Sequence, residues 1–282
     1  MTTPKNNAPT VQKVANEASS SSLTKIFAAL AIVVAIASGY LIYIFILGNP
    51  ANFEGGDPYA GHPHNMLGTI HKGGIAIVPI LIALNILVIL IAIERFITLQ
   101  KTSGKASAAS FIKNIRTYLS NNKIDEAMAA CDKQQGSLAN VVKTGLGRYA
   151  VLNADNHLDK NAKVAALEKE LEEATSLELP MMSKNMSILS TSASIGTLVG
   201  LIGTVIGMIK AFSALATAGA PDTAALAIGI SEALINTALG IICSTLAIIA
   251  YNVFTNKIDA MTYSMDEAGY SIVGQFQAQK QN

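Results

Sequence analysis

The stretch TAALAIGISEALINTALGIICSTLAIIAYNVFTN, residues 223–256, is 34 residues long and contains one charged side chain, Glu232. A helix of about 20 apolar residues is long enough to cross the hydrocarbon core of a bilayer. We therefore expect this stretch to form a transmembrane helix that carries a carboxylate. An ionised carboxylate is costly in hydrocarbon, so Glu232 must be paired, hydrated or protonated.

Three further uncharged stretches are long enough to span a membrane. They comprise the 28 residues between Lys25 and Glu54, the 21 between Lys72 and Glu94, and the 25 between Lys184 and Lys210. Only 14% of all residues are charged and 51% are hydrophobic, whereas soluble domains carry about 25% charged residues. The sequence thus predicts an all-α integral membrane protein with four transmembrane helices and a helical cytoplasmic domain.

Lysine and arginine are unevenly distributed among the connections. The N-terminal tail has three of them, the segment from Gly48 to Lys72 has one, and the long segment from Glu94 to Lys184 has thirteen. Cytoplasmic loops carry an excess of these residues, which predicts a multi-pass protein with both termini in the cytoplasm. The net charge of +1, with no dominant basic patch, argues against nucleic acid as a partner.

The expected organisation follows from these spans. It comprises a disordered cytoplasmic tail at 1–25, a first span at 26–47, a periplasmic segment at 48–72, a second span at 73–97, a cytoplasmic helical domain at 98–184, a third span at 185–217, a periplasmic turn at 218–222, a fourth span at 223–256 and a cytoplasmic tail at 257–282. We expect the cytoplasmic domain to continue directly into the third span as one long helix, with a kink or local break at Pro180.

The third span contains glycines at spacings that put them on one helical face: Gly196, Gly200, Gly203 and Gly207. Small residues allow helix backbones to approach closely in lipid, where no hydrophobic effect drives association. This face can pack against the fourth span of the same chain or against an identical subunit, and the sequence does not separate the two.

A hairpin that turns near Pro221 aligns polar residues of the last two spans. It places Thr204 level with Thr237, and Lys210 level with Glu232. Lys210 and Glu232 can form a structural ion pair, or Glu232 can belong to an ion pathway with the threonines and with Asn236, one turn away. A membrane threonine can also simply bond its own backbone, so both interpretations stay open.

Three segments resemble the core motifs of the MotA/TolQ/ExbB proton channel family, and its ExbB and TolQ branch most closely. They are GLIGTVIGMIKAF at 200–212, GISEALINTALG at 229–240 and YNVF at 251–254. The resemblance covers about residues 73–256. It implies that Thr204 and Thr237 face a pore and that Glu232 is the family's intramembrane glutamate.

The resemblance also implies partners. It predicts a homopentameric ring in membrane lipid, whose pore holds one transmembrane helix from each of two ExbD-like chains, and a TonB-like protein that relays motion to the outer membrane. The first span and the segment after it are additional to the usual three-span pattern of this branch. That segment contains His62, His64 and His71, for which we expect a solvated loop rather than a metal site.

The resemblance therefore implies a proton-conducting stator subunit of an ExbB/ExbD-type motor in the bacterial inner membrane, which energises TonB-dependent transport. A TolQ-like stator, a motor specialised for motility or secretion, and a non-conducting scaffold are the alternatives. We expect no enzyme activity and no cofactor, because the chain shows no nucleophile–base set, phosphate-binding loop or intramembrane protease motif. At the inner end of the second span, Glu94 and Arg95 are expected to form an end-capping pair.

Overall fold

A computed structural model describes residues 29–59, 61–155, 157–217 and 223–278, with side chains left out of the description at 214–217 and 223–225. The tail predicted at 1–25 and the turn predicted at 218–222 lie outside these residues, as do the last four residues of the chain. The described part is helical apart from turns, loops and one isolated β-bridge between Phe53 and Pro63.

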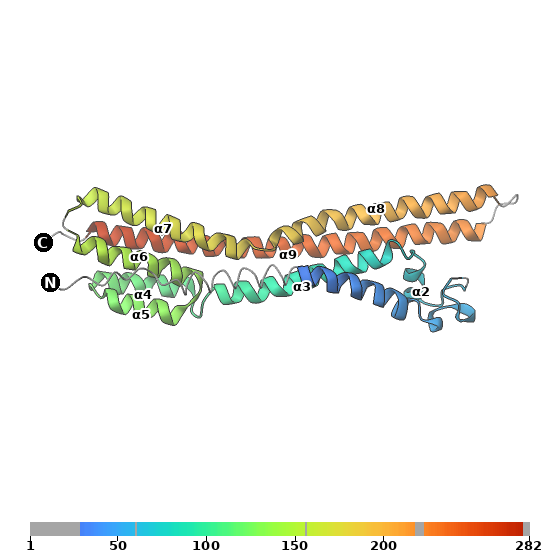
Figure 1. Cartoon of the computed structure of the whole chain (residues 1–282), viewed down its shortest axis with the longest axis horizontal. Helices are drawn as coiled ribbons and strands as arrows, with labels where there is room; N and C mark the ends of the chain where they lie inside the picture. Colours follow the sequence, from blue (N-terminus) through green and yellow to red (C-terminus); the bar gives the residue numbers. More distant parts are fainter. Residues whose placement is uncertain (1–28, 60, 156, 218–222, 279–282) are drawn as a thin grey trace, which may run out of the picture. The chain divides into compact units, whose positions relative to one another are not determined.

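The helices are shown in Figure 1. A first helix, Ala29–Leu47, ends in the π-helical η1, Ile42–Leu47. It is followed by η2 (Pro50–Asn52), η3 (Glu54–Gly56), α2 (Met66–His71), α3 (Val78–Thr102), α4 (Ala108–Ser120), α5 (Ile124–Gln134), α6 (Gly136–Ala154), α7 (Lys160–Ser183), α8 (Met186–Thr217) and α9 (Thr223–Ala278).

Four of the described helices are long and apolar enough to cross a membrane: Ala29–Leu47, Val78–Thr102, Met186–Ser213 and a stretch within Leu226–Ala278. The chain is a multi-pass, all-helical membrane protein, as its uncharged stretches predict.

The chain divides into two compact units, Met1–Ile91 with Ile188–Ile248 and Ala92–Ser187 with Ile249–Asn282. In the first unit, the helix Ala29–Leu47 buries one residue per turn: Ala31, Ala35, Gly39, Tyr43 and Leu47. At Gly39 an added Cβ would lie 3.0 Å from Ala83 Cβ of α3, so this helix and α3 lie in close contact.

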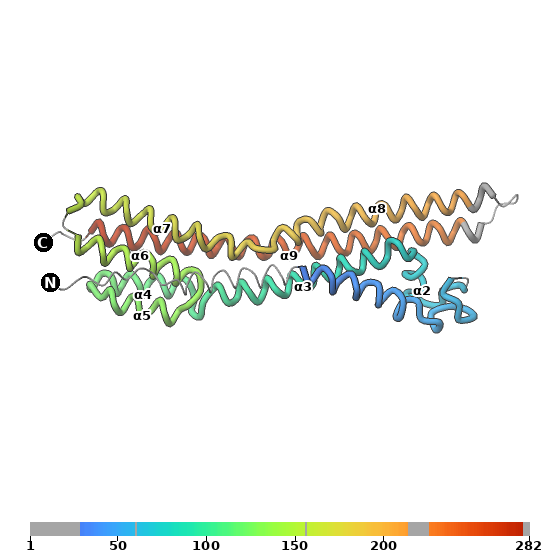
Figure 2. Tube along the Cα trace, in the orientation of Figure 1, coloured from blue at the N-terminus to red at the C-terminus, as the bar shows by residue number. Residues whose placement is uncertain are grey.

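In the second unit, α4 to α7 pack with the C-terminal part of α9 (Figure 2). Helix α4 buries an apolar stripe that includes Phe111, Ile115 and Leu119. Tyr149 of α6 lies edge-on against Phe276 of α9, with ring centroids 4.9 Å apart. Residues 257–278, expected as a tail, are therefore a helical part of this unit.

The prediction of one continuous helix from the cytoplasmic domain into the third span is wrong. Helix α7 ends at Ser183 and α8 begins at Met186, and Asn185 between them has a left-handed φ of 62°. Pro180 lies inside α7 and does not end it. Asparagine tolerates the left-handed region better than most residues, so the break is at Asn185.

The Glu94–Arg95 ion pair of α3 binds the residues on both sides of this break, in addition to capping the end of the second span. The Arg95 side chain is 1% exposed, donates from Nε to Glu94 Oε2 at 2.6 Å and donates to the Met182 carbonyl at 3.3 Å. Asn185 Nδ2 donates to the same Glu94 oxygen at 3.3 Å. The pair therefore links α3 to the junction of α7 and α8.

Two glycines of α6 provide a matched test of packing in the second unit. A Cβ added at Gly145 would collide with Leu171, a buried side chain of α7, whereas a Cβ at Gly147 meets no atom within 4 Å. Gly147→Ala should stabilise the protein by roughly 0.5–1 kcal/mol, because a helical glycine loses more backbone entropy than alanine. Gly145→Ala should destabilise it, as thermal unfolding in detergent will show. Stabilisation by both substitutions would contradict the packing of α6 on α7.

Candidate functional site

The antiparallel contact between α8 and α9 forms the centre of the candidate site. All four glycines of α8 are buried. A Cβ added at Gly200 would lie 3.2 Å from Gly240 Cα, and one at Gly207 would lie 3.0 Å from Ala233 Cβ. The glycines therefore bring the two backbones of one chain into close contact, which is one of the two arrangements that the sequence allows.

The two threonines predicted to line a pore are half-buried, and Thr237 lies at this contact. Thr204 Oγ1 donates to the Leu201 carbonyl of its own helix at 2.6 Å. Thr237 Oγ1 donates to the Gly200 carbonyl of α8 at 3.5 Å. Each hydroxyl is thus bonded to backbone, and its oxygen keeps acceptor capacity for water or an ion.

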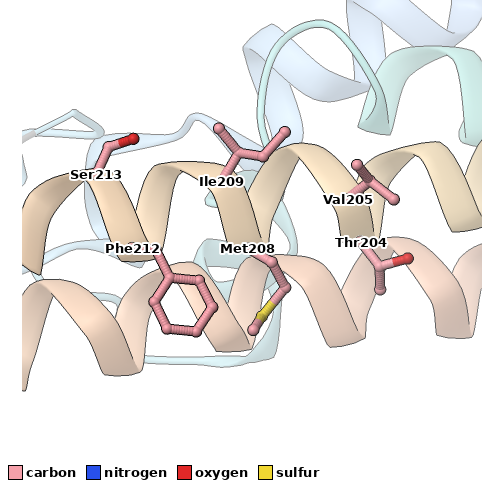
Figure 3. Close-up of a pocket in the computed structure, with 6 residues that line it drawn as sticks. All are labelled: Thr204, Val205, Met208, Ile209, Phe212 and Ser213. Carbon is pink, nitrogen blue, oxygen red and sulfur yellow. The ribbon is translucent and has the colours of Figure 1, made fainter.

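Thr204 also lines a shallow, mostly apolar hollow on α8 (Figure 3). Thr204, Met208 and Phe212 project to one side of the helix, as expected for residues four apart. Val205, Ile209 and Ser213 line the rest of the hollow from the adjacent side. A helix of a partner chain that packs here would meet apolar side chains and the hydroxyls of Thr204 and Ser213.

Glu232 lies apart from this hollow. Its Oε2 is 3.6 Å from Lys210 Nζ, and the Glu232 side chain is 16% exposed whereas that of Lys210 is 59% exposed. Lys72 and Tyr43, which come from the first part of the chain, are also within electrostatic range of the Glu232 carboxylate. The structure thus surrounds this carboxylate with cationic and phenolic groups.

Asn236 is buried, with 2% of its surface exposed. Its Nδ2 donates to the Gly73 carbonyl at 3.0 Å, and it packs directly against Gly203. Asn236 therefore ties the segment before α3 to α9 instead of sharing the surface of the Thr204 hollow. Its Oδ1 is buried and has no hydrogen-bond partner.

A second polar contact lies farther along the same helix pair. Thr197 Oγ1 and Ser244 Oγ are 2.7 Å apart, and Ser244 also donates to the Ala193 carbonyl. Hydroxyl groups therefore occur at two levels between α8 and α9, and they can donate or accept hydrogen bonds at both.

The segment between the first helix and α3 forms a folded cap, defined here as residues 48–59 and 61–74. His62 and His64 are exposed, whereas His71 is buried against aromatic rings. No group of three potential metal ligands lies together among the described residues. The histidines stand out in the sequence, but no sequence pattern indicates the hydrogen bond of Gly73 with Asn236 or the proximity of Tyr43 and Lys72 to Glu232.

The buried bond of Asn236 yields a direct prediction. Asn236→Ala leaves the buried Gly73 carbonyl without its donor, and an unsatisfied buried group costs about 1–3 kcal/mol. Asn121→Ala is the control, because Asn121 is exposed and its Nδ2 donates to the Thr117 carbonyl of α4 at 2.9 Å. Thermal unfolding in detergent should show a larger loss of stability for Asn236→Ala than for the control. Equal losses of stability would contradict the hydrogen bond between Asn236 and Gly73.

No curated protein matches the chain at a significant level. Residues 133–267, which include α8 and the part of α9 with Glu232, Asn236 and Thr237, match the MotA/TolQ/ExbB proton channel family. The resemblance seen in the motifs is thereby confirmed, and residues 133–267 are similar to the MotA/TolQ/ExbB proton channel family.

Proposed function

We propose that this chain is a proton-conducting stator subunit of an ExbB/ExbD-type motor that energises TonB-dependent transport across an outer membrane. The observation that carries the proposal is the family match over α8 and most of α9. These two helices carry Thr204 and Thr237. The core motifs of these helices resemble the ExbB and TolQ branch.

The proposed ion path runs beside the Thr204 hollow. Its apolar lining from Met208 and Phe212 suits an apolar transmembrane helix, and the threonine hydroxyls supply hydrogen bonds to water or to a carboxylate on that helix. An ExbD-like partner fits this chemistry, with two of its helices in the pore of a pentamer of this chain.

The driving energy comes from charge movement across the membrane. One elementary charge that crosses 100 mV releases about 2.3 kcal/mol. In the proposed motor these steps rotate the ring relative to the partner dimer, and a TonB-like protein relays the motion. The distribution of lysine and arginine supports placing both termini in the cytoplasm, with the chain in the bacterial inner membrane.

A non-conducting scaffold is the second candidate, because Glu232 is paired with Lys210 in the structure. In that case the carboxylate only links α8 to α9. A TolQ-like role and a motor for motility or secretion share the conducting mechanism and differ in the process that they energise.

Proton flux into vesicles that contain the chain and an ExbD-like partner separates conduction from scaffolding. Thr204→Ala should reduce flux about tenfold while the complex still purifies, because a hydrogen bond of about 1–1.5 kcal/mol lost at the barrier corresponds to that factor. Thr117→Ala is the control, since Thr117 is an exposed threonine of α4 that bonds its own helix.

Three results distinguish the candidates. Flux that falls in Thr204→Ala but not in Thr117→Ala supports an ion path at the hollow. Unchanged flux in Thr204→Ala shows that the path lies elsewhere. Absence of flux in the wild-type complex under an imposed potential favours the scaffold.

A further inference from the structure

The cap is a built structure with its own polar interior. Asn52 is 6% exposed and donates to the Ile46 and Leu47 carbonyls at the end of the first helix, at 2.8 and 3.0 Å. Asn65 in turn donates to Asn52 Oδ1 at 2.9 Å. The cap is therefore hydrogen-bonded onto the end of the first helix and is not a solvated loop.

His71 lies at the centre of the cap and is 5% exposed. Its ring stacks on Tyr43 with centroids 4.4 Å apart, and the edges of Phe53 and Tyr59 approach it with centroid distances of 5.3 and 6.1 Å. Gly48 lies against His71 Nε2 with no space for a side chain. The imidazole thus occupies an aromatic enclosure built from the first helix and the cap.

The charges around this enclosure oppose a second positive charge. Lys72, the next residue, donates to the Tyr59 carbonyl at 2.8 Å and lies over the Phe53 ring. The other titratable groups of the surrounding elements are Tyr43 of the first helix, Lys210 of α8, Glu232 of α9 and, in the cap, Glu54, Asp57, Tyr59, His62 and His64. Burial, and then Lys72, lower the pKa of His71 below its ordinary value.

The end of the cap is attached to the first helix and to α9. The His71 carbonyl accepts a hydrogen bond from Tyr43 Oη at 3.2 Å, and the Gly73 carbonyl accepts one from Asn236 of α9 at 3.0 Å. Lys210 Nζ lies beside Gly74. A movement of residues 71–74 therefore acts on α9 one turn from Glu232.

From this geometry we propose that the cap is an acid-sensitive clasp: protonation of His71 opens it and releases Gly73 from Asn236. Burial beside Lys72 destabilises the imidazolium ion, because a buried charge needs a counter-charge or water. The clasp responds to the pH on the side of the membrane that the cap faces. It is independent of whether the chain conducts protons.

The sign of the pH effect follows from linkage. The pKa of His71 is lower in the closed cap than in the open one, so the open cap binds the proton more tightly. The closed form is fully stable above the ordinary histidine pKa of about 6.5 and loses stability as the pH falls below it. Each unit of difference between the two pKa values increases the equilibrium constant for opening about tenfold at low pH.

Hydrogen exchange of the full-length protein in lipid nanodiscs tests the clasp. The amides of Lys72, Gly73 and Gly74 donate to carbonyls within the cap at 3.0–3.2 Å, so their protection reports closure. After correction for intrinsic exchange, protection should fall about tenfold or more in the wild type between about pH 7.5 and about pH 5, which lie on either side of the ordinary histidine pKa.

Two histidine variants separate His71 from its neighbours. His71→Phe keeps a ring in the enclosure without a titratable group and should keep the cap protected at both pH values. His64→Phe alters an exposed histidine of the same cap and should respond to pH as the wild type does.

Three results overturn the proposal. They are a wild-type cap with equal protection at both pH values, a pH response that persists in His71→Phe, and a response that is lost in His64→Phe. The first is decisive even if His71→Phe does not fold.

Discussion

Close backbone contact between α8 and α9 is the constraint on which the rest of the first unit depends. In lipid, apolar side chains gain little from leaving the solvent, so helices associate through packing and hydrogen bonds. Gly196, Gly200, Gly203 and Gly207 supply the packing, and a Cβ at Gly203 would lie 2.5 Å from Asn236 Cβ. A side chain at these positions would separate the helices and with them every polar contact that they share.

This close contact explains why the fourth span can carry polar residues at all. Buried polar groups in a membrane must find partners inside the protein. Asn236 reaches Gly73, Ser244 reaches Thr197 and Glu232 reaches Lys210. These bonds leave the surface with the Thr204 hollow apolar apart from hydroxyl groups. The same helix pair thus presents a cluster of charged groups near the cap and a separate, nearly apolar surface to a partner.

The sequence predicts the features that depend on local period and on the length of uncharged stretches. These include the four spans, the glycine face and a hairpin register that puts Lys210 opposite Glu232, whose charged atoms lie 3.6 Å apart. The break at Asn185 could not be predicted, because it depends on Glu94, which is 91 residues away. The folded cap likewise depends on distant contacts such as Tyr43 with His71, and its histidines suggested a solvated loop.

The position of the cap changes how the Glu232–Lys210 pair should be interpreted. An ion pair isolated in hydrocarbon would serve only to join two helices. Its two charges would stay together, because separating them leaves an uncompensated buried charge. Here Lys210 also lies beside Gly74, and Lys72 is within electrostatic range of Glu232. The end of the cap therefore contributes to the electrostatic environment of the carboxylate, and a displaced cap would change that environment without altering any residue of α8 or α9. Glu232 can therefore pair with Lys210 and still influence ion flow, because the charges of the pair contribute to the electric field that a moving ion experiences.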